Sequence, residues 1–107
     1  MYPDIVVIYK GRIAVLEVKT FRSGRYVYVN RDQYEKLLEF AKRAGGTPYI
    51  AVKKVGSGEW FFYSIDMLVE TSSGRFRVDF KDAFKAMRLE GFIAVLKGVK
   101  KLDEFAK

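Results

Sequence analysis

The segment PDIVVIYKGRIAVLEVK, residues 3–19, constrains the fold more than any other part of the chain. Two runs rich in β-branched residues, 4–9 and 12–20, flank the dipeptide Lys10-Gly11. This pattern predicts a β-hairpin, because glycine readily adopts the backbone angles of a tight turn.

The register of this hairpin decides which side chains meet. A two- or four-residue loop places Tyr9 opposite Arg12, and stepping outward places Asp4 opposite Glu17. A three-residue loop would instead place Asp4 opposite Val18, since a slip of one residue turns every side chain to the other face. The first register predicts two carboxylates about 5 Å apart, where like charges repel.

Side-chain alternation adds a lysine to the same face. Lys19 lies two residues after Glu17, whereas Leu16 and Val18 point to the opposite face. A divalent cation would remove the repulsion between Asp4 and Glu17. The alternative is that Asp4 only begins a strand, and that Glu17 and Lys19 are solvated residues of a sheet edge.

Composition favours a polyanionic partner. The chain has 20 Lys and Arg residues against 13 Asp and Glu, a net charge of +7 and a pI of about 9.7. Nucleic acid is the first candidate for a chain of this charge. A basic surface that serves only solubility is the alternative.

Two absences limit the chemistry. With no cysteine, the chain has no disulfide, iron–sulfur cluster or thiol nucleophile, and with no histidine it lacks the usual zinc site and the Ser-His-Asp triad. Catalysis would therefore use carboxylates, lysine, tyrosine or an oxygen-bound metal. No apolar run approaches the roughly 18 residues that span a membrane. We expect one domain, residues 1–107, that is cytoplasmic and nucleoid-associated.

The clearest helix follows the hairpin, over residues 30–44. Asn30 is a favourable N-cap, and Gln33 completes a capping-box pattern three residues later. The alternative role for Gln33 is accessory to the hairpin site, where it would orient a water or a phosphate. The other expected elements are strands over 26–29, 47–55, 59–65 and 75–80, the last at a sheet edge, a helical turn over 66–69, and helices beginning at 81 and over 89–106.

Basic residues near the ends of these strands are candidates for contact with DNA phosphates. Aromatic residues are interleaved with them in the segment after Lys19, and this mixture suits base stacking as well as phosphate contact. An ordinary surface loop is the alternative. The candidates are Arg12, Arg22, Arg25, Lys53 and Lys54.

The ordered motifs together resemble a known family. PD, then EVK on one hairpin, followed by a helix and two strands, is similar to the PD-(D/E)xK nuclease superfamily. The segments PDIVVIYKGRIAVLEVKT, YVNRDQYEKLLEFAKRAGGTPYIAVKK and EWFFYSIDML resemble archaeal Holliday junction resolvases over nearly the whole chain.

The resemblance implies roles for four residues. Asp4, Glu17 and the backbone carbonyl of Val18 would hold Mg²⁺ or Mn²⁺, and Lys19 would lie beside the attacking water and the scissile phosphate. Asp4, Glu17 and Lys19 would be the catalytic residues. Oxygen ligands suit such hard cations.

The sequence departs from this family in one respect. Family members carry a further segment before the PD motif, with a basic helix, another catalytic glutamate and a loop serine. A truncation, a misjudged start codon and a natural binding-only relative all account for the difference. We expect the 107-residue chain to bind metal and DNA but to cleave poorly.

These observations predict an α/β fold with a mixed central sheet flanked by helices, in the restriction-endonuclease-like class. The predicted function is metal-dependent cleavage of four-way DNA junctions by a homodimer, because two matched cuts suit twofold symmetry. The alternatives are a non-catalytic DNA-binding relative, or another nuclease of the superfamily that acts on flapped DNA or RNA.

Overall fold

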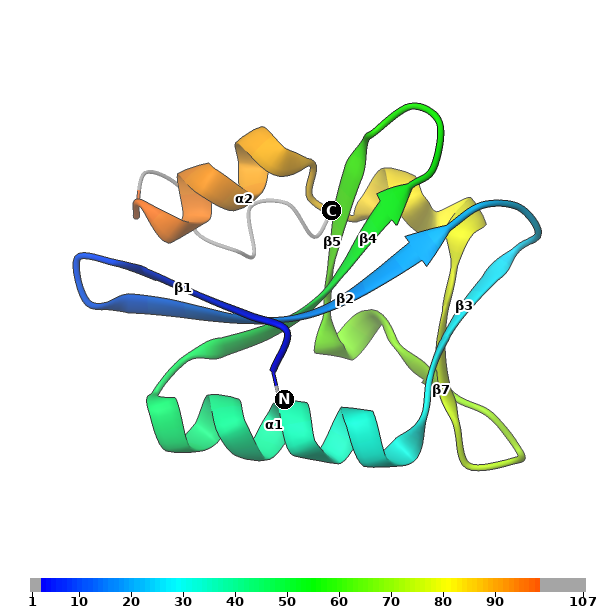
Figure 1. Ribbon diagram of the computed structural model, residues 1–107, viewed down its shortest axis with the longest axis horizontal. Helices are drawn as coiled ribbons and strands as arrows, with labels where there is room; N and C mark the ends of the chain where they lie inside the picture. Colours follow the sequence, from blue (N-terminus) through cyan, green and yellow to red (C-terminus); the bar gives the residue numbers. More distant parts are fainter. Residues whose placement is uncertain (1–2, 99–107) are drawn as a thin grey trace.

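A four-stranded sheet forms the centre of the computed structural model, which describes residues 3–98 (Figure 1). Its strand order is β1-β2-β4-β5; β2 and β4 are parallel, and the other neighbours are antiparallel. The predicted mixed sheet is therefore confirmed. Its strands are β1 (Ile5–Tyr9), β2 (Arg12–Phe21), β4 (Thr47–Lys54) and β5 (Trp60–Ser64).

The β1–β2 hairpin has the first of the two predicted registers. Tyr9 pairs with Arg12, and the ladder ends where Ile5 pairs with Leu16. The two-residue loop has positive φ at both positions, 48° at Lys10 and 81° at Gly11. Such a loop matches the twist of the strands that it joins.

A second, three-stranded sheet lies beside the first. It has the order β3-β7-β6, with β3 (Tyr26–Val29), β7 (Phe76–Asp79) and β6 (Val69–Glu70). The strand expected at a sheet edge over 75–80 is thus the central strand of this sheet, because β3 and β6 pair with its two sides. The helical turn expected over 66–69 is a 3-10 turn over Ile65–Met67, followed by β6.

Helices cover both faces of the central sheet. Helix α1 (Arg31–Ala44) begins at Asn30 with the predicted capping box, and α2 (Leu89–Leu96) lies on the other side. Helix α2 ends at Leu96, before the end expected at 106, and residues 99–106 of that prediction lie outside the described range. The helix expected to begin at 81 is a 3-10 helix over Phe80–Lys85. No helix within residues 3–98 is long and apolar enough to cross a bilayer.

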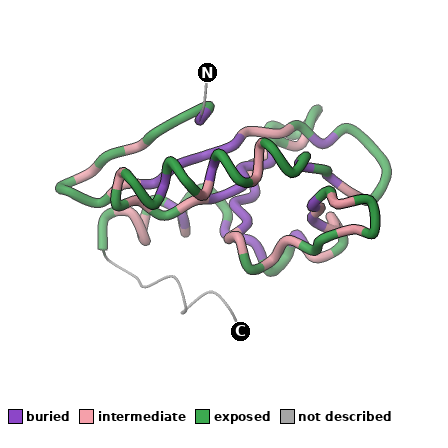
Figure 2. Tube along the Cα trace, turned by 90° about the horizontal axis from the view of Figure 1, so that it is seen from below, coloured by how far each residue is buried: buried purple, intermediate pink, exposed green. Residues whose placement is uncertain are grey.

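The core consists of two clusters, one on each face of the central sheet. On the α1 face, Leu37 packs with Val15, Ile50 and Val52, and none of the four is exposed to solvent. On the α2 face, Phe92 packs with residues that include Leu16, Ala51 and Phe62. Figure 2 shows the buried strands behind α1 and the exposed arm of the β1–β2 hairpin. Glu17 and Lys19 alternate with Leu16 and Val18, so they lie on the α1 face.

Replacing Tyr63 by phenylalanine is expected to raise the free energy of unfolding by about 1 kcal/mol. The hydroxyl of Tyr63 is buried without a hydrogen-bond partner among residues 3–98, and burial raises its pKa. Phenylalanine keeps the buried ring and removes this unsatisfied group. Urea denaturation measures the difference, with Tyr49→Phe as a matched core variant that should change stability less. A clearly less stable Tyr63→Phe protein would contradict this interpretation.

Candidate metal centre and nucleic-acid interface

Asp4, Glu17 and Lys19 lie together at the open end of the β1–β2 hairpin. The Val18 N–H donates a hydrogen bond of 2.8 Å to Asp4 Oδ2, which fixes the carboxylate beside β2. Lys19 Nζ lies 3.7 Å from Glu17 Oε2. The structure thus brings together the three side chains that the hairpin register predicted.

Glu17 is the one buried charged residue in the part of the chain that the structure describes, with 3% of its surface exposed. Its Oε1 atom has no hydrogen-bond partner within residues 3–98. Burial raises the pKa of Glu17 and the charge of Asp4 raises it further, whereas Lys19 opposes both effects. A buried carboxylate oxygen without a partner is costly unless a cation or a donor reaches it.

These residues fit a hard divalent cation. The two carboxylates supply oxygen ligands, and the Val18 carbonyl is a third candidate. In a strand, the N–H and C=O of one residue point toward the same neighbour, so the Val18 carbonyl points toward Asp4, beyond the last β1–β2 pair. Among residues 3–98, no cluster of three or more acidic, histidine or cysteine side chains is suited to a metal. A cation here would therefore rely on water and substrate oxygens for its remaining ligands.

Gln33 connects this site to helix α1. Its backbone N–H donates to Asn30 Oδ1 at 2.7 Å, and its Oε1 accepts from the Asn30 N–H at 3.3 Å, so the capping box is complete. The same Oε1 accepts a hydrogen bond of 2.9 Å from Lys19 Nζ. The two roles considered for Gln33 are thus compatible, and the helix N-terminus positions the lysine ammonium.

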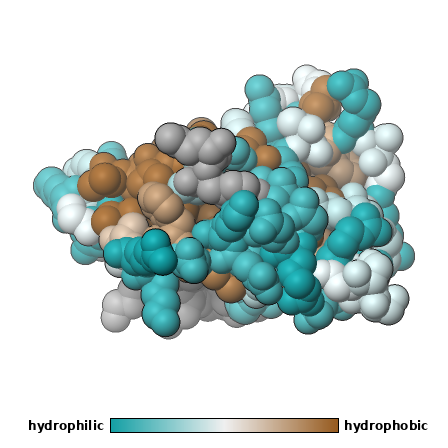
Figure 3. Space-filling view, turned by 60° about the horizontal axis from the view of Figure 1, so that its bottom comes forward, coloured by the Kyte–Doolittle hydropathy of each residue, from teal (hydrophilic) through white to brown (hydrophobic). Residues whose placement is uncertain are grey.

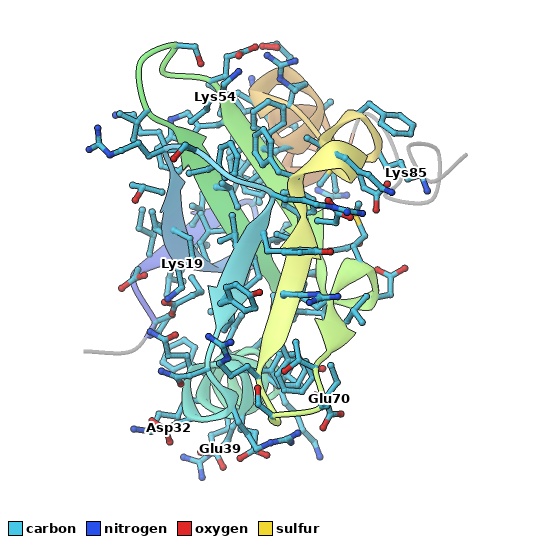
Figure 4. The ribbon with its side chains drawn as sticks, turned by 90° about the vertical axis from the view of Figure 1, so that its right-hand side faces the viewer. Lys19, Asp32, Glu39, Lys54, Glu70 and Lys85 are labelled. Carbon is cyan, nitrogen blue, oxygen red and sulfur yellow. The ribbon has the colours of Figure 1, made fainter. Side chains whose placement is uncertain are left out.

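Lys53 and Lys54, two of the predicted DNA contacts, lie on opposite faces of the sheet. In the β2–β4 register, Lys54 pairs with Phe21 and so shares the face of Glu17 and Lys19. Lys53 lies on the α2 face, with its Nζ 5.9 Å from the centroid of the Trp60 ring. Figure 4 shows Lys19 and Lys54 along the same side of the molecule.

The three predicted arginines also differ in their surroundings. Arg22 is exposed in the loop after β2 and forms no ion pair among the described residues, whereas Arg25 binds Asp79 at 2.8 Å. Arg12 lies at the hairpin loop, five residues before Glu17, which corresponds to about 17 Å along a strand. The structure therefore separates Arg12 from the candidate metal centre.

Comparison with known proteins identifies the family. Residues 1–101 match the family model described as archaeal Holliday junction resolvase. The chain belongs to this family. The crossover junction endodeoxyribonuclease Hjc of Sulfurisphaera tokodaii is 35% identical over 91 residues. The match covers 85% of this chain and 62% of that relative, so the chain spans less than two thirds of its length.

Other members of the resolvase family support the assignment. The Hjc of Sulfolobus acidocaldarius is 28% identical, over 96% of this chain and 72% of its own. The solved structure of Archaeoglobus fulgidus Hjc, described as a Holliday junction resolvase, superposes with a TM-score of 0.75 at 27% identity. That superposition covers 90% of this chain and 73% of the solved chain.

Proposed function

We propose that this chain is a metal-dependent endonuclease that binds and cleaves four-way DNA junctions. The observation that carries the proposal is the buried Glu17, whose unpaired Oε1 lies in a site with Asp4 and Lys19. The names of the relatives support the same activity, since they are crossover junction endodeoxyribonucleases.

The residues of the site have distinct tasks in this proposal. Asp4, Glu17 and the Val18 carbonyl hold Mg²⁺ or Mn²⁺. When bound there, such an ion would supply Lewis-acid chemistry, polarising the phosphate and lowering the pKa of a water. Lys19, held by Gln33, places a positive charge where negative charge grows on the scissile phosphate. Arg22 and Lys54 bind neighbouring phosphates along the same side of the molecule.

The homodimer is part of the same proposal. Two symmetric cuts across a junction suit an isologous pair of sites. An exposed apolar surface supports association, because Val6 and Ile8, which lie on the α1 face of β1, are 40% and 66% exposed. Figure 3 shows hydrophobic side chains gathered over this hairpin arm. Sedimentation velocity tests the proposal, and a monomer at all concentrations, with or without junction DNA, would oppose it.

A non-catalytic DNA-binding protein is the second candidate function. It is favoured by the small number of acidic ligands, because no third acidic side chain joins Asp4 and Glu17 within residues 3–98. This candidate predicts junction binding without cleavage. The proposed nuclease predicts cleavage that requires Mg²⁺ or Mn²⁺ and Glu17.

Junction binding is expected to weaken steeply with salt, and Arg22→Ala should lower the slope of log K against log salt by about 0.9. Each phosphate contact releases condensed counterions, and Arg22 has no carboxylate partner within the described residues. Fluorescence anisotropy with a labelled four-way junction measures the slope, with Lys42→Ala as the control for one lost charge. Competition with a linear duplex tests the substrate, and equal affinity for the two DNAs would argue against a resolvase.

A further inference from the structure

Arginine and tyrosine side chains cover the outward face of the three-stranded sheet. Val27 and Val29 of β3 are buried in the core, so Tyr26 and Tyr28, which alternate with them, point outward. Tyr28 pairs with Arg77 of β7, which therefore shares this face. We call Arg25, Tyr26, Tyr28, Arg75 and Arg77 the arginine–tyrosine ladder.

Guanidinium groups and phenol rings are in contact throughout the ladder. Arg75 Cζ lies 4.1 Å from the centroid of the Tyr28 ring, and Arg77 Cζ lies 4.0 Å from that of Tyr26. Arg25 Cζ lies 5.1 Å from the centroid of the Tyr26 ring, and Arg77 contacts the same ring. The two tyrosine rings are 6.1 Å apart. These contacts hold flat, polarizable groups at the surface of a sheet rather than on a loop.

The ladder carries positive charge that the described residues do not neutralise. Arg25 is paired with Asp79, but neither Arg75 nor Arg77 forms an ion pair within residues 3–98. The side-chain N–H groups of Arg75 and Arg77 form no hydrogen bond within residues 3–98, so they are available to a ligand. A purely structural ladder explains the ring contacts but not the absence of carboxylate partners for Arg75 and Arg77.

The ladder also leads toward the candidate metal centre. Strand β3 ends at Val29, and the next residue, Asn30, caps α1 together with Gln33. The Oε1 of Gln33 accepts the hydrogen bond from Lys19 Nζ. In Figure 4, β3 and β7 face the viewer, and Lys19 lies beside β3. A DNA strand at Lys19 could therefore continue over Tyr28 and Tyr26.

We propose that the ladder binds single-stranded DNA. Bases of an unpaired strand stack on aromatic and guanidinium planes, and phosphates take hydrogen bonds from arginine edges. A regular duplex offers only its phosphates, because its bases are already stacked on one another. This second binding surface requires neither the metal nor cleavage. Its test is therefore independent of the test of the junction endonuclease.

Fluorescence anisotropy with a labelled oligothymidine of about 20 nucleotides tests the proposal. The 107-residue chain should bind it, and replacing Tyr26 and Tyr28 together by leucine should weaken binding by about tenfold or more. The matched Tyr26→Phe/Tyr28→Phe protein keeps both rings and should bind as the parent does. Replacing Arg75 and Arg77 together by alanine should lower the salt slope by about 1.4, since about 0.7 is lost per single-strand phosphate contact.

Four controls separate base stacking from charge attraction, misfolding and loss of the metal centre. Lys42→Ala/Lys85→Ala removes the same charge elsewhere on the surface and should preserve most of the binding. Blunt duplex and polyglutamate should bind the leucine variant as they bind the parent, and thermal melting should show that the variant is folded. The Mn²⁺ response of the leucine variant should equal that of the parent, which separates this test from that of the metal centre.

Two outcomes would overturn the proposal. The first is a folded leucine variant that binds oligothymidine within about twofold of the parent, because loss of two stacking rings should cost more. The second is an equal loss of affinity for oligothymidine and polyglutamate, which would make the face a general polyanion surface.

Discussion

Replacing Lys19 by methionine is expected to slow junction cleavage by about 10²-fold without weakening Mn²⁺ binding. Lys19 Nζ lies 3.7 Å from Glu17 Oε2 and donates to Gln33 Oε1 at 2.9 Å. Its charge is thus fixed beside the carboxylates, where negative charge would grow on the scissile phosphate. Methionine keeps an unbranched side chain but removes this charge.

Single-turnover cleavage of a labelled junction in Mn²⁺ measures the effect of Lys19→Met. Gln33→Ala, which removes the partner of Lys19 but leaves the ammonium group, should slow cleavage less, by about tenfold. Because Gln33 also completes the cap of α1, thermal melting should show that the Gln33→Ala variant is folded before its cleavage rate is compared. Parent-like cleavage by Lys19→Met would show that the ammonium has no part in the reaction.

Glu17→Gln is expected to abolish cleavage and yet to raise the metal-free stability of the fold by about 1 kcal/mol. The pKa of Glu17 is raised from its ordinary value of 4.5, first by burial and then by the charge of Asp4. The folded state therefore binds a proton at Glu17 more tightly than the unfolded state does. As pH rises through 4.5 to the folded-state pKa, the parent loses stability, and glutamine removes this loss.

Urea denaturation without divalent metal, at about pH 4 and about pH 8, measures this effect. The difference in free energy of unfolding between Glu17→Gln and the parent should be larger at the higher pH. Glu59→Gln is the matched control, because a hydrogen bond from Ser57 and the charge of Arg88 lower the pKa of Glu59. This pKa shift has the opposite sign, so Glu59→Gln should not gain stability as pH rises. A Glu17→Gln protein less stable than the parent at the higher pH would contradict the predicted cost of the buried charge.

Local sequence signals predicted the hairpin and the first helix because their determinants are close in the chain. The loop at Lys10-Gly11 fixes the register that brings Asp4 level with Glu17, and Asn30 with Gln33 fixes the start of α1. Side-chain alternation along β4 was also sufficient to place Lys53 and Lys54 on opposite faces, although the sequence interpretation treated them together.

Contacts between distant segments were not predictable in the same way. Strands β3 and β7 pair residues such as Val27 and Val78, which no local pattern relates, so the second sheet was missed. The hydrogen bond between Lys19 and Gln33 depends on how α1 packs against β2, and the pairing of Arg25 with Asp79 depends on the second sheet. The arginine–tyrosine ladder follows from the same non-local pairing.

The most direct test of the metal centre is calorimetric titration of Mn²⁺ into the parent, Asp4→Asn and Glu17→Gln. Asparagine keeps an oxygen that can accept from the Val18 N–H, so Asp4→Asn removes the charge with little change to the hairpin. The parent should bind Mn²⁺, with a gain of about 2.7 kcal/mol in stability at roughly 100 times Kd. Both variants should lose this binding, whereas Glu59→Gln should keep it. Unchanged Mn²⁺ binding in both Asp4→Asn and Glu17→Gln would contradict the assignment.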